Sequence, residues 1–151
     1  GSMAQAILPQ AWRWLHWAVA AAMEPPSVVA SEGQQGLLRM LVTHAEKELT
    51  DRRFQQRPSL KCGVVNSPGY LEAQVASELL ASQDVDLLCI FQVGAPHGKG
   101  VRCRLFASAG GKADAAEVAT LHGGEGGARE AAFSVADLMA FERLWAADEV
   151  P

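Results

Sequence analysis

The feature that most constrains the fold is a pair of strand-like segments joined by a glycine-containing turn. Residues 85–93 (VDLLCIFQV) are almost continuously apolar, as expected for a strand that is covered on both faces of a sheet. The turn sequence GAPHGKG follows, and residues 101–107 (VRCRLFA) form a second strand-like segment. Because only a short turn separates them, we expect the two segments to pair as an antiparallel hairpin.

Further elements flank this hairpin on both sides. Apolar residues recur every three or four positions over residues 35–54, which predicts an amphipathic helix, and residues 27–36 are expected to be a loop. The remaining elements give an α/β fold, a small mixed β-sheet covered by helices. We expect strands at residues 60–65 and 131–135, and helices at residues 70–82, 113–121 and 136–147.

The domain organisation follows from a change of pattern after Pro58. Before this residue the chain is helical in character, and after it strands alternate with helices. We expect residues 1–3 to be the remnant of a cleaved tag, residues 4–58 an N-terminal helical extension or linker, and residues 59–151 the α/β domain.

Composition excludes several classes of protein. Hydrophobic residues make up 49% of the 151 residues and charged residues 20%, which argues against extensive disorder. The net charge of −4 argues against a protein that coats nucleic acid through bulk charge, although a local basic patch is compatible with it. No apolar run is long enough to span a membrane, so we expect no membrane partner.

The three cysteines, Cys62, Cys89 and Cys103, are flanked by aliphatic residues and show no spacing typical of a metal site. An odd number of such cysteines predicts reduced, buried thiols. We therefore expect an intracellular protein in a reducing compartment, with the organelle left open.

A tryptophan-rich segment precedes the α/β region. Residues 10–23 (QAWRWLHWAVAAAM) have helical propensity and contain Trp12, Trp14 and Trp17. The segment lacks the Lys/Arg-rich polar face of a helix that lies on a membrane, so packing against protein is favoured. We expect it to contact a protein partner or a further domain.

One face of the second hairpin strand combines positive charge with an aromatic ring. Because side chains alternate along a strand, Arg102, Arg104 and Phe106 share a face. Such a stripe suits a phosphate backbone with stacked bases. The alternative interpretation is a solvated sheet face on which a helix covers Phe106.

A glycine-rich segment lies between the helix predicted at residues 113–121 and the strand predicted at residues 131–135. Consecutive glycines adopt positive φ cheaply and let backbone N–H groups approach a phosphate, although a plain turn explains them as well. Neighbouring donors are expected from Arg129, Lys99 and His122. The candidate glycines are Gly123, Gly124, Gly126 and Gly127.

Residues 60–135, about half of the chain, resemble the C-terminal, DHH-associated domain of the DHH phosphoesterase superfamily. VVNSP (64–68) is similar to the first strand of that domain, and VRCRLF (101–106) is similar to its Val-Arg-Val-Ser-Leu-Arg strand. Residues 123–133 (GGEGGAREAAF) align without gaps with its Gly-Gly-Gly-Gly-His-x-x-Ala-Ala-Gly-Phe signature. The superfamily includes oligoribonucleases, cyclic-dinucleotide phosphodiesterases, exopolyphosphatases and single-strand-specific exonucleases. The resemblance therefore implies a domain that binds the substrate of a phosphoesterase.

The sequence departs from this signature where the resemblance implies ligand contacts. The family's histidine, which would face the substrate phosphate, corresponds to Gly127. The third glycine corresponds to Glu125, whose carboxylate would repel a phosphate, and the last glycine corresponds to Ala132. In the strand, the family's serine corresponds to Arg104 and its arginine to Phe106.

Catalysis in the family is implied to reside in a separate N-terminal domain, where Asp and His clusters hold divalent metal ions. Residues 4–58 contain two histidines and one aspartate, and no Asp-His-His sequence. The histidines of this chain also lack ligand partners at a suitable spacing. We expect no catalytic residue, metal or cofactor in this chain, and a divalent metal only in a catalytic DHH domain of the parent protein. The four histidines are His16, His44, His97 and His122.

Three functional hypotheses follow. The first is a substrate-binding-type domain that recognises a phosphoester, nucleotide or short single-stranded nucleic acid through the glycine-rich segment and the Arg/Phe face. The second is a degenerate, non-catalytic relative that acts as a protein–protein interaction module. The third is a metal-dependent phosphodiesterase whose catalytic domain is supplied by sequence outside this chain.

Overall fold

The computed structural model describes residues 28–67, 69–94 and 98–147, which divide into two compact units at His44/Ala45. Most of helix α3 (Val28–Glu48) belongs to the first unit. In the residues that the structure describes, no helix is both long and apolar enough to cross a membrane. The other elements, all in the second unit, are β1 (Thr50–Phe54), β2 (Arg57–Asn66), α4 (Glu72–Ser82), β3 (Leu87–Val93), β4 (Val101–Ala107), α5 (Ala115–Leu121), β5 (Glu125–Gly126), β6 (Glu130–Val135) and α6 (Leu138–Glu142).

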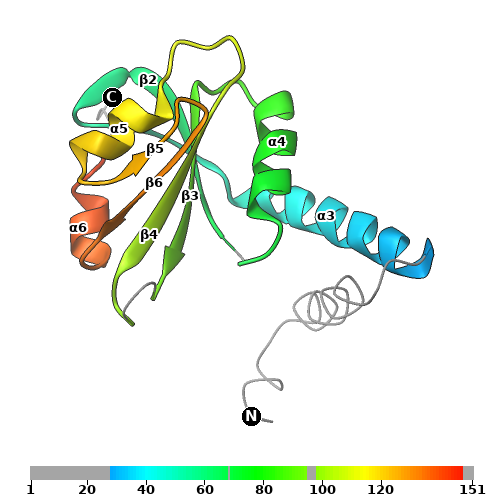
Figure 1. The fold of residues 1–151 in the computed structure, drawn as a ribbon. Coiled ribbons are helices and arrows are strands. Elements are labelled where there is room, and N and C mark those ends of the chain that lie inside the picture. Colours follow the sequence, from blue (N-terminus) through cyan, green and yellow to red (C-terminus); the bar gives the residue numbers. More distant parts are fainter. Residues whose placement is uncertain (1–27, 68, 95–97, 148–151) are drawn as a thin grey trace. The chain divides into compact units, whose positions relative to one another are not determined.

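The strands of the second unit form one sheet in the order β1-β2-β3-β4-β6-β5 (Figure 1). Strands β2 and β3 are parallel and are joined through α4, whereas the other neighbouring pairs are antiparallel. The β3–β4 pair is the expected hairpin, with Val93 opposite Val101 at the end nearest the turn. The predicted fold class, a mixed α/β sheet with helices and an N-terminal helix, is confirmed.

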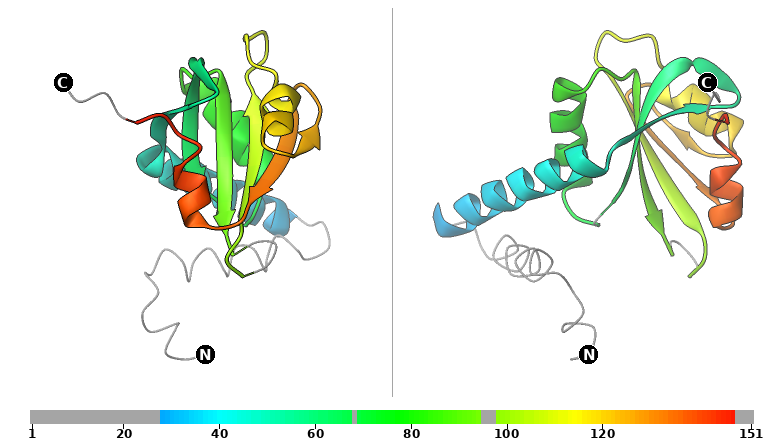
Figure 2. Two further views of the ribbon diagram at one scale, coloured as in Figure 1. Left: turned by 90° about the vertical axis from the view of Figure 1, so that its left-hand side faces the viewer. Right: turned by 180° about the vertical axis from the view of Figure 1, so that it is seen from behind.

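Different helices cover the two faces of the sheet: α4 lies on one face, and α5 and α6 lie on the other (Figures 1 and 2). Strand β4 sends Val101, Cys103 and Leu105 into the core on the α5/α6 side. Its alternate residues point to the α4 side. Strand β3 is buried on both faces from Leu87 to Ile90, as its continuous apolar sequence predicts.

Two expectations for the N-terminal part of the described chain are wrong. Residues 28–36, expected to be a loop, lie within α3, and this helix ends at Glu48. Residues 50–54 (TDRRF), expected to continue the helix, form the edge strand β1, which pairs antiparallel with β2. Strand pairing and the complete burial of Phe54 outweigh the helical spacing, because tertiary contacts override a weak local propensity.

The C-terminal elements also differ from the prediction. Helix α6 is five residues long and does not extend over residues 136–147. Trp145, expected in that helix, forms an isolated β-bridge with Phe54, and the two ring centroids are 4.3 Å apart. The short strand β5, which was not predicted, pairs with Ala131 and Ala132 of β6.

The three cysteines are free and buried, as predicted. Burial raises the pKa of Cys62 to about 12. A hydrogen bond with Cys103, together with burial, raises the pKa of Cys89. The thiols of Cys62 and Cys89 therefore remain protonated at neutral pH and are poor nucleophiles.

Candidate functional site

Two arginines, Arg102 and Arg104, lie on the α4 side of strand β4, as their alternation in the sequence predicts. Arg102 lies between Gln92 on β3 and Ser134 on β6. The β6 residues that share this face are exposed, so the arginines border an open part of the sheet. These β6 residues are Glu130, Ala132 and Ser134.

Both guanidinium groups converge on the carboxylate of Glu72, the first residue of α4. Arg102 Nη2 lies 2.9 Å from Glu72 Oε1 and 2.8 Å from Oε2, and Arg104 Nη1 lies 2.8 Å from Oε1. The hydroxyl of Ser67 donates a further hydrogen bond to Oε2. Glu72 is only 8% exposed. The two arginines are thus arranged to hold a single oxyanion between them.

The other donors of the arginine pair have different partners. Arg102 Nη2 also donates to Gln92 Oε1 at 2.9 Å, and Arg104 Nη2 donates to the carboxylate of Glu130 at the edge of the open face. Arg102 Nε is buried and has no hydrogen-bond partner within the described part of the chain. The arginine side chains are 35% and 25% exposed, so both can be reached from solvent.

The ionisation of this cluster is set by burial and by hydrogen bonds. Burial alone would raise the pKa of Glu72, but hydrogen bonds from Ser67 and Arg104 and the charges of both arginines lower that pKa below its ordinary value. Burial likewise opposes the charge of Arg104, whereas hydrogen bonds to Glu72 and Glu130 raise its pKa. Glu72 is therefore ionised at neutral pH.

The turn between β2 and α4 places Glu72 at the carboxyl end of the parallel β2–β3 pair. Leu71, immediately before the helix, has φ 52° and ψ 37°, in the left-handed region that non-glycine residues rarely occupy. No side chain of the described residues caps this helix start. Backbone strain of this kind concentrates at functional sites, and ligands of open α/β sheets bind outside the carboxyl ends of parallel strands.

Phe106, the aromatic residue of the predicted stripe, is only 6% exposed. The guanidinium carbon of Arg104 lies 5.0 Å from the centroid of its ring, within the range of a cation–π contact. The ring therefore supports Arg104 instead of presenting a free surface to solvent. This placement matches the alternative interpretation of the sequence, in which Phe106 is covered.

A groove of about 520 Å³ adjoins the arginine pair between α4 and the ends of β4 and β6. Arg129 and Glu130 line one side of it, so one charge of each sign faces the groove. Small side chains dominate its remaining walls. They are Ala73, Ser77 and Ala81 of α4, Ala107 at the end of β4, and Ser108 and Ala109 after it, with Leu80 and Phe106 completing the lining.

The backbone of the glycine-rich segment forms hydrogen bonds within the fold. Gly123, with φ 81°, follows α5, and the N–H groups of Gly123 and Gly124 donate to carbonyls in the last turn of that helix. Gly126 lies in β5, and Gly127 N–H donates to Glu130 O in the β5–β6 turn. The N–H groups of Gly123, Gly124 and Gly127 therefore have partners within the fold.

The structure separates His122 from the arginines. His122 Nδ1 lies 2.9 Å from Val118 O, and its ring packs between Phe54 and Phe133, with centroid distances of 5.3 and 4.9 Å. Both phenylalanines belong to the core on the α5/α6 side of the sheet. Lys99 is exposed in the β3–β4 loop.

Other predicted positions have no structural description. The proposed protein-docking residues Trp12, Trp14 and Trp17 lie outside the described residues, as do His16 and His97. No group of three or more His, Cys, Asp or Glu side chains suited to a metal ion occurs in the ranges that the structure describes.

The sequence reasoning missed the partners of the arginines. Glu72 lies 30 residues before Arg102 in the chain, and nothing in its own helix distinguishes it from an exposed glutamate. One signal was present. Glu72 starts the helix that follows the first parallel strand, so its side chain lies at the strand ends where functional groups gather.

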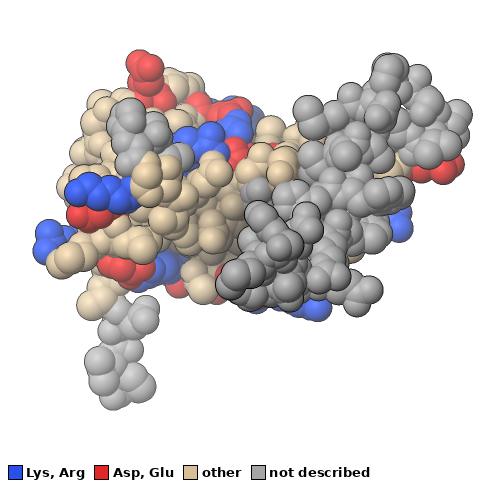
Figure 3. Space-filling model, turned by 90° about the horizontal axis from the view of Figure 1, so that it is seen from below, with Lys and Arg blue, Asp and Glu red and all other residues tan. Residues whose placement is uncertain are grey.

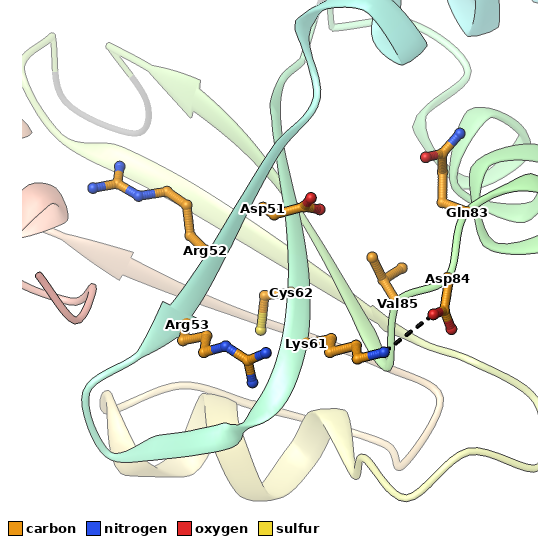
Figure 4. A pocket seen from close by; sticks show the side chains of 8 residues that line it. All are labelled: Asp51, Arg52, Arg53, Lys61, Cys62, Gln83, Asp84 and Val85. Atoms are coloured by element: carbon orange, nitrogen blue, oxygen red, sulfur yellow. Dashed lines mark hydrogen bonds and ion pairs between the residues drawn. The ribbon is translucent and has the colours of Figure 1, made fainter. Parts of the chain in front are cut away.

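A second hollow, of about 430 Å³, lies at β1 and β2, at the opposite edge of the sheet from β5 and β6 (Figure 4). Its cations already have partners: Lys61 pairs with Asp84 at 3.1 Å, and Arg53 donates to Pro58 O at 2.9 Å. Arg52 pairs with Glu142 at 3.1 Å and points away from the Lys61–Asp84 pair. Figure 3 shows the same mixing of charges on one face of the molecule, where basic and acidic side chains alternate.

Comparison with known proteins gives distant structural likeness only. No protein-family model matches the chain, and no curated protein matches its sequence. One similar structure is an uncharacterized protein from Helicobacter pylori G27, with 18% identity and a TM-score of 0.43 over 78% of this chain and 31% of that one. Another is a pGpG-specific phosphodiesterase from Vibrio cholerae, with 9% identity and a TM-score of 0.47 over 77% of this chain and 40% of that one. The chain thus spans less than half the length of either structure, and the DHH-associated resemblance remains a prediction.

Proposed function

We propose that the chain is a phosphoester-binding domain that takes a nucleotide or a short single-stranded nucleic acid on its arginine face. The observation that carries this proposal is the convergence of Arg102 and Arg104 on one carboxylate beside an open part of the sheet. Two guanidinium groups that share an oxyanion form the geometry that also grips a phosphate. The resemblance of residues 60–135 to a DHH-associated domain supports the same ligand class. The proposal assigns binding to these residues and no bond cleavage.

The phosphate would bind at the rim of the cluster, in place of Glu130. Glu130 is half exposed and contacts the arginine pair only through Arg104 Nη2, so a ligand oxygen can replace it at little cost. Exposed ion pairs contribute only about 0–1 kcal/mol.

The buried Nε of Arg102, which lacks a partner in the described chain, is a further donor at this site. An unsatisfied buried donor costs about 1–3 kcal/mol, and a bound oxyanion that reached it would recover this free energy.

The test is the binding of a fluorescein-labelled single-stranded hexanucleotide, measured by fluorescence anisotropy. The variants are Arg102→Gln and Arg104→Gln, and the matched control is Arg52→Gln. Arg52 is also ion-paired with a glutamate, also lies over an aromatic ring and is similarly exposed, at 28% against 25% for Arg104. We expect each variant on the arginine face to weaken binding by about tenfold or more, because charge-assisted hydrogen bonds contribute about 1.5–3 kcal/mol. The control should bind like the wild type.

Salt dependence provides a second readout. With one phosphate neutralised on a single strand, the logarithm of the binding constant should fall against the logarithm of salt concentration with a slope of about −0.7. Loss of either arginine should remove most of that slope. Equal affinities for all three arginine variants, or binding that does not depend on salt, would show that the arginine face is not the site.

A further inference from the structure

The two carboxylates that contact the arginine pair are held very differently. Glu72 is buried and accepts hydrogen bonds from Ser67, Arg102 and Arg104. Glu130 has a side chain that is 50% exposed, and among the residues that the structure describes its ion pair is with Arg104. A ligand that approaches from the open face meets Glu130 first, whereas displacing Glu72 would require breaking all of its hydrogen bonds.

The charge of the site follows from this difference. Arg102 and Arg104 together carry two positive charges, and Glu72 permanently cancels one of them. When a ligand replaces Glu130, one positive charge remains to be neutralised. An oxyanion with one negative charge leaves the cluster neutral, whereas a second negative charge would lie uncompensated close to the buried carboxylate of Glu72.

We infer that Glu72 is a specificity determinant that makes the arginine pair selective for singly charged phosphodiesters over doubly charged terminal phosphates. This inference rests on the proposed function and names the substrate class of the same site. A phosphodiester carries one negative charge, whereas a phosphomonoester carries about −1.5 to −2 at pH 7 because its second pKa is about 6. The site therefore recognises internal phosphates of a strand and disfavours its phosphorylated ends.

Other charged groups near the pair do not change this count. On the α4 side of the sheet, Arg129 and Glu130 both line the adjoining groove and carry opposite charges. His122 packs on the opposite face, between aromatic rings of the core. Among the charged residues that contact the arginines, Glu72 is the buried one, and its ionisation is maintained by Ser67 and by the arginines themselves.

The experiment compares two ligands that differ by one charge, adenosine 5′-monophosphate and its methyl ester, by isothermal titration at pH 7.5. Wild-type protein should bind the methyl ester at least about tenfold more tightly than the monophosphate. Glu72→Gln keeps the shape of the side chain and removes its charge, so it should abolish or reverse this preference. Glu130→Gln should improve the binding of both ligands and change their ratio less than Glu72→Gln does, because Glu130 is half exposed and solvent screens its charge. Glu78→Gln, an exposed position on the same helix, is the matched control and should leave both affinities unchanged.

A wild-type measurement at pH 5 keeps the test valid if Glu72→Gln does not fold. At that pH the monophosphate is mostly singly charged, so the wild type should bind it about as well as the methyl ester. If neither ligand nor a hexanucleotide binds to any variant, the proposed function itself fails. If both ligands bind with a ratio that is the same at both pH values and in Glu72→Gln, the specificity role is wrong while the binding site stands.

Discussion

Replacement of Gly124 by alanine is a change for which the structure predicts a large effect in the glycine-rich segment. A Cβ atom built on Gly124 would lie 2.1 Å from Ala132 O, 2.5 Å from Phe133 Cβ and 2.8 Å from Phe133 Cα. Backbone and Cβ atoms cannot move aside as a flexible side-chain end can. The substitution must therefore push the end of α5 away from β6 and disturb the pairing of Glu125 with Ala132.

The expected magnitudes differ among the glycines. Overpacking costs about 1–3 kcal/mol, and more where backbone must shift, so Gly124→Ala should lower the free energy of unfolding by about 3 kcal/mol or more. Gly123→Ala meets no atom within 4 Å but must adopt a φ of 81°, which costs about 1–2 kcal/mol. Gly127→Ala is the matched control, because its Cβ would lie 3.8 Å from Glu130 O. Its effect should stay within about 0.5 kcal/mol.

Thermal unfolding followed by circular dichroism distinguishes these cases. For a unit of this size, 1 kcal/mol corresponds to a shift in Tm of about 4–8 °C. Gly124→Ala should therefore lower Tm by at least about 12 °C, whereas Gly127→Ala should shift it by no more than about 4 °C. If Gly124→Ala and Gly127→Ala both unfold at the wild-type temperature, the close backbone approach is wrong. The glycines would then need another explanation, such as direct contact with a ligand.

Two further predictions concern titration and reactivity. Because the folded-state pKa of Glu72 is below its ordinary value of about 4.5, its contribution to stability is complete above that pH and is lost as the pH falls through the folded-state pKa. Urea denaturation between pH 7 and pH 3 should show a steeper loss of stability for wild type than for Glu72→Gln, and identical pH profiles would contradict the buried ion-pair cluster. Cys62, Cys89 and Cys103 should resist a thiol reagent in the folded protein and react together in urea, because all three are buried and the pKa of Cys62 is raised to about 12. Rapid labelling of any one of them without urea would show that the core is open.

Much of the sheet could be predicted because its strands have strong local patterns. The continuous apolar run at Leu87–Val93 and the alternation in Val101–Ala107 each indicate strands by themselves, and the short turn between them specifies the hairpin. The alternation also placed Arg102 and Arg104 on one face. Strand β1 was missed because its charged sequence TDRRF has no strand-like alternation, and it becomes a strand only by pairing with β2.

The candidate site could be predicted only in part. The alternation of β4 identifies the arginines, but it does not show that a carboxylate 30 residues away neutralises one of their charges. Proximity in sequence was misleading for His122, which lies beside the glycine-rich segment yet is half-buried against the core ring of Phe54. Ring packing with residues distant in sequence decided where this histidine points.

By itself the sequence determined the fold class, the β3–β4 hairpin, the buried thiols and the face on which the arginines lie. The hairpin and the facing of the arginines depend on patterns over fewer than ten residues, which a strand's geometry converts directly into facing and burial. Only the tertiary structure decided that Glu72 is buried between the arginines and that Phe106 lies beneath Arg104. Burial and charge pairing depend on which elements pack together, and here they join the start of α4 to the middle of β4, 30 to 32 residues later in the chain.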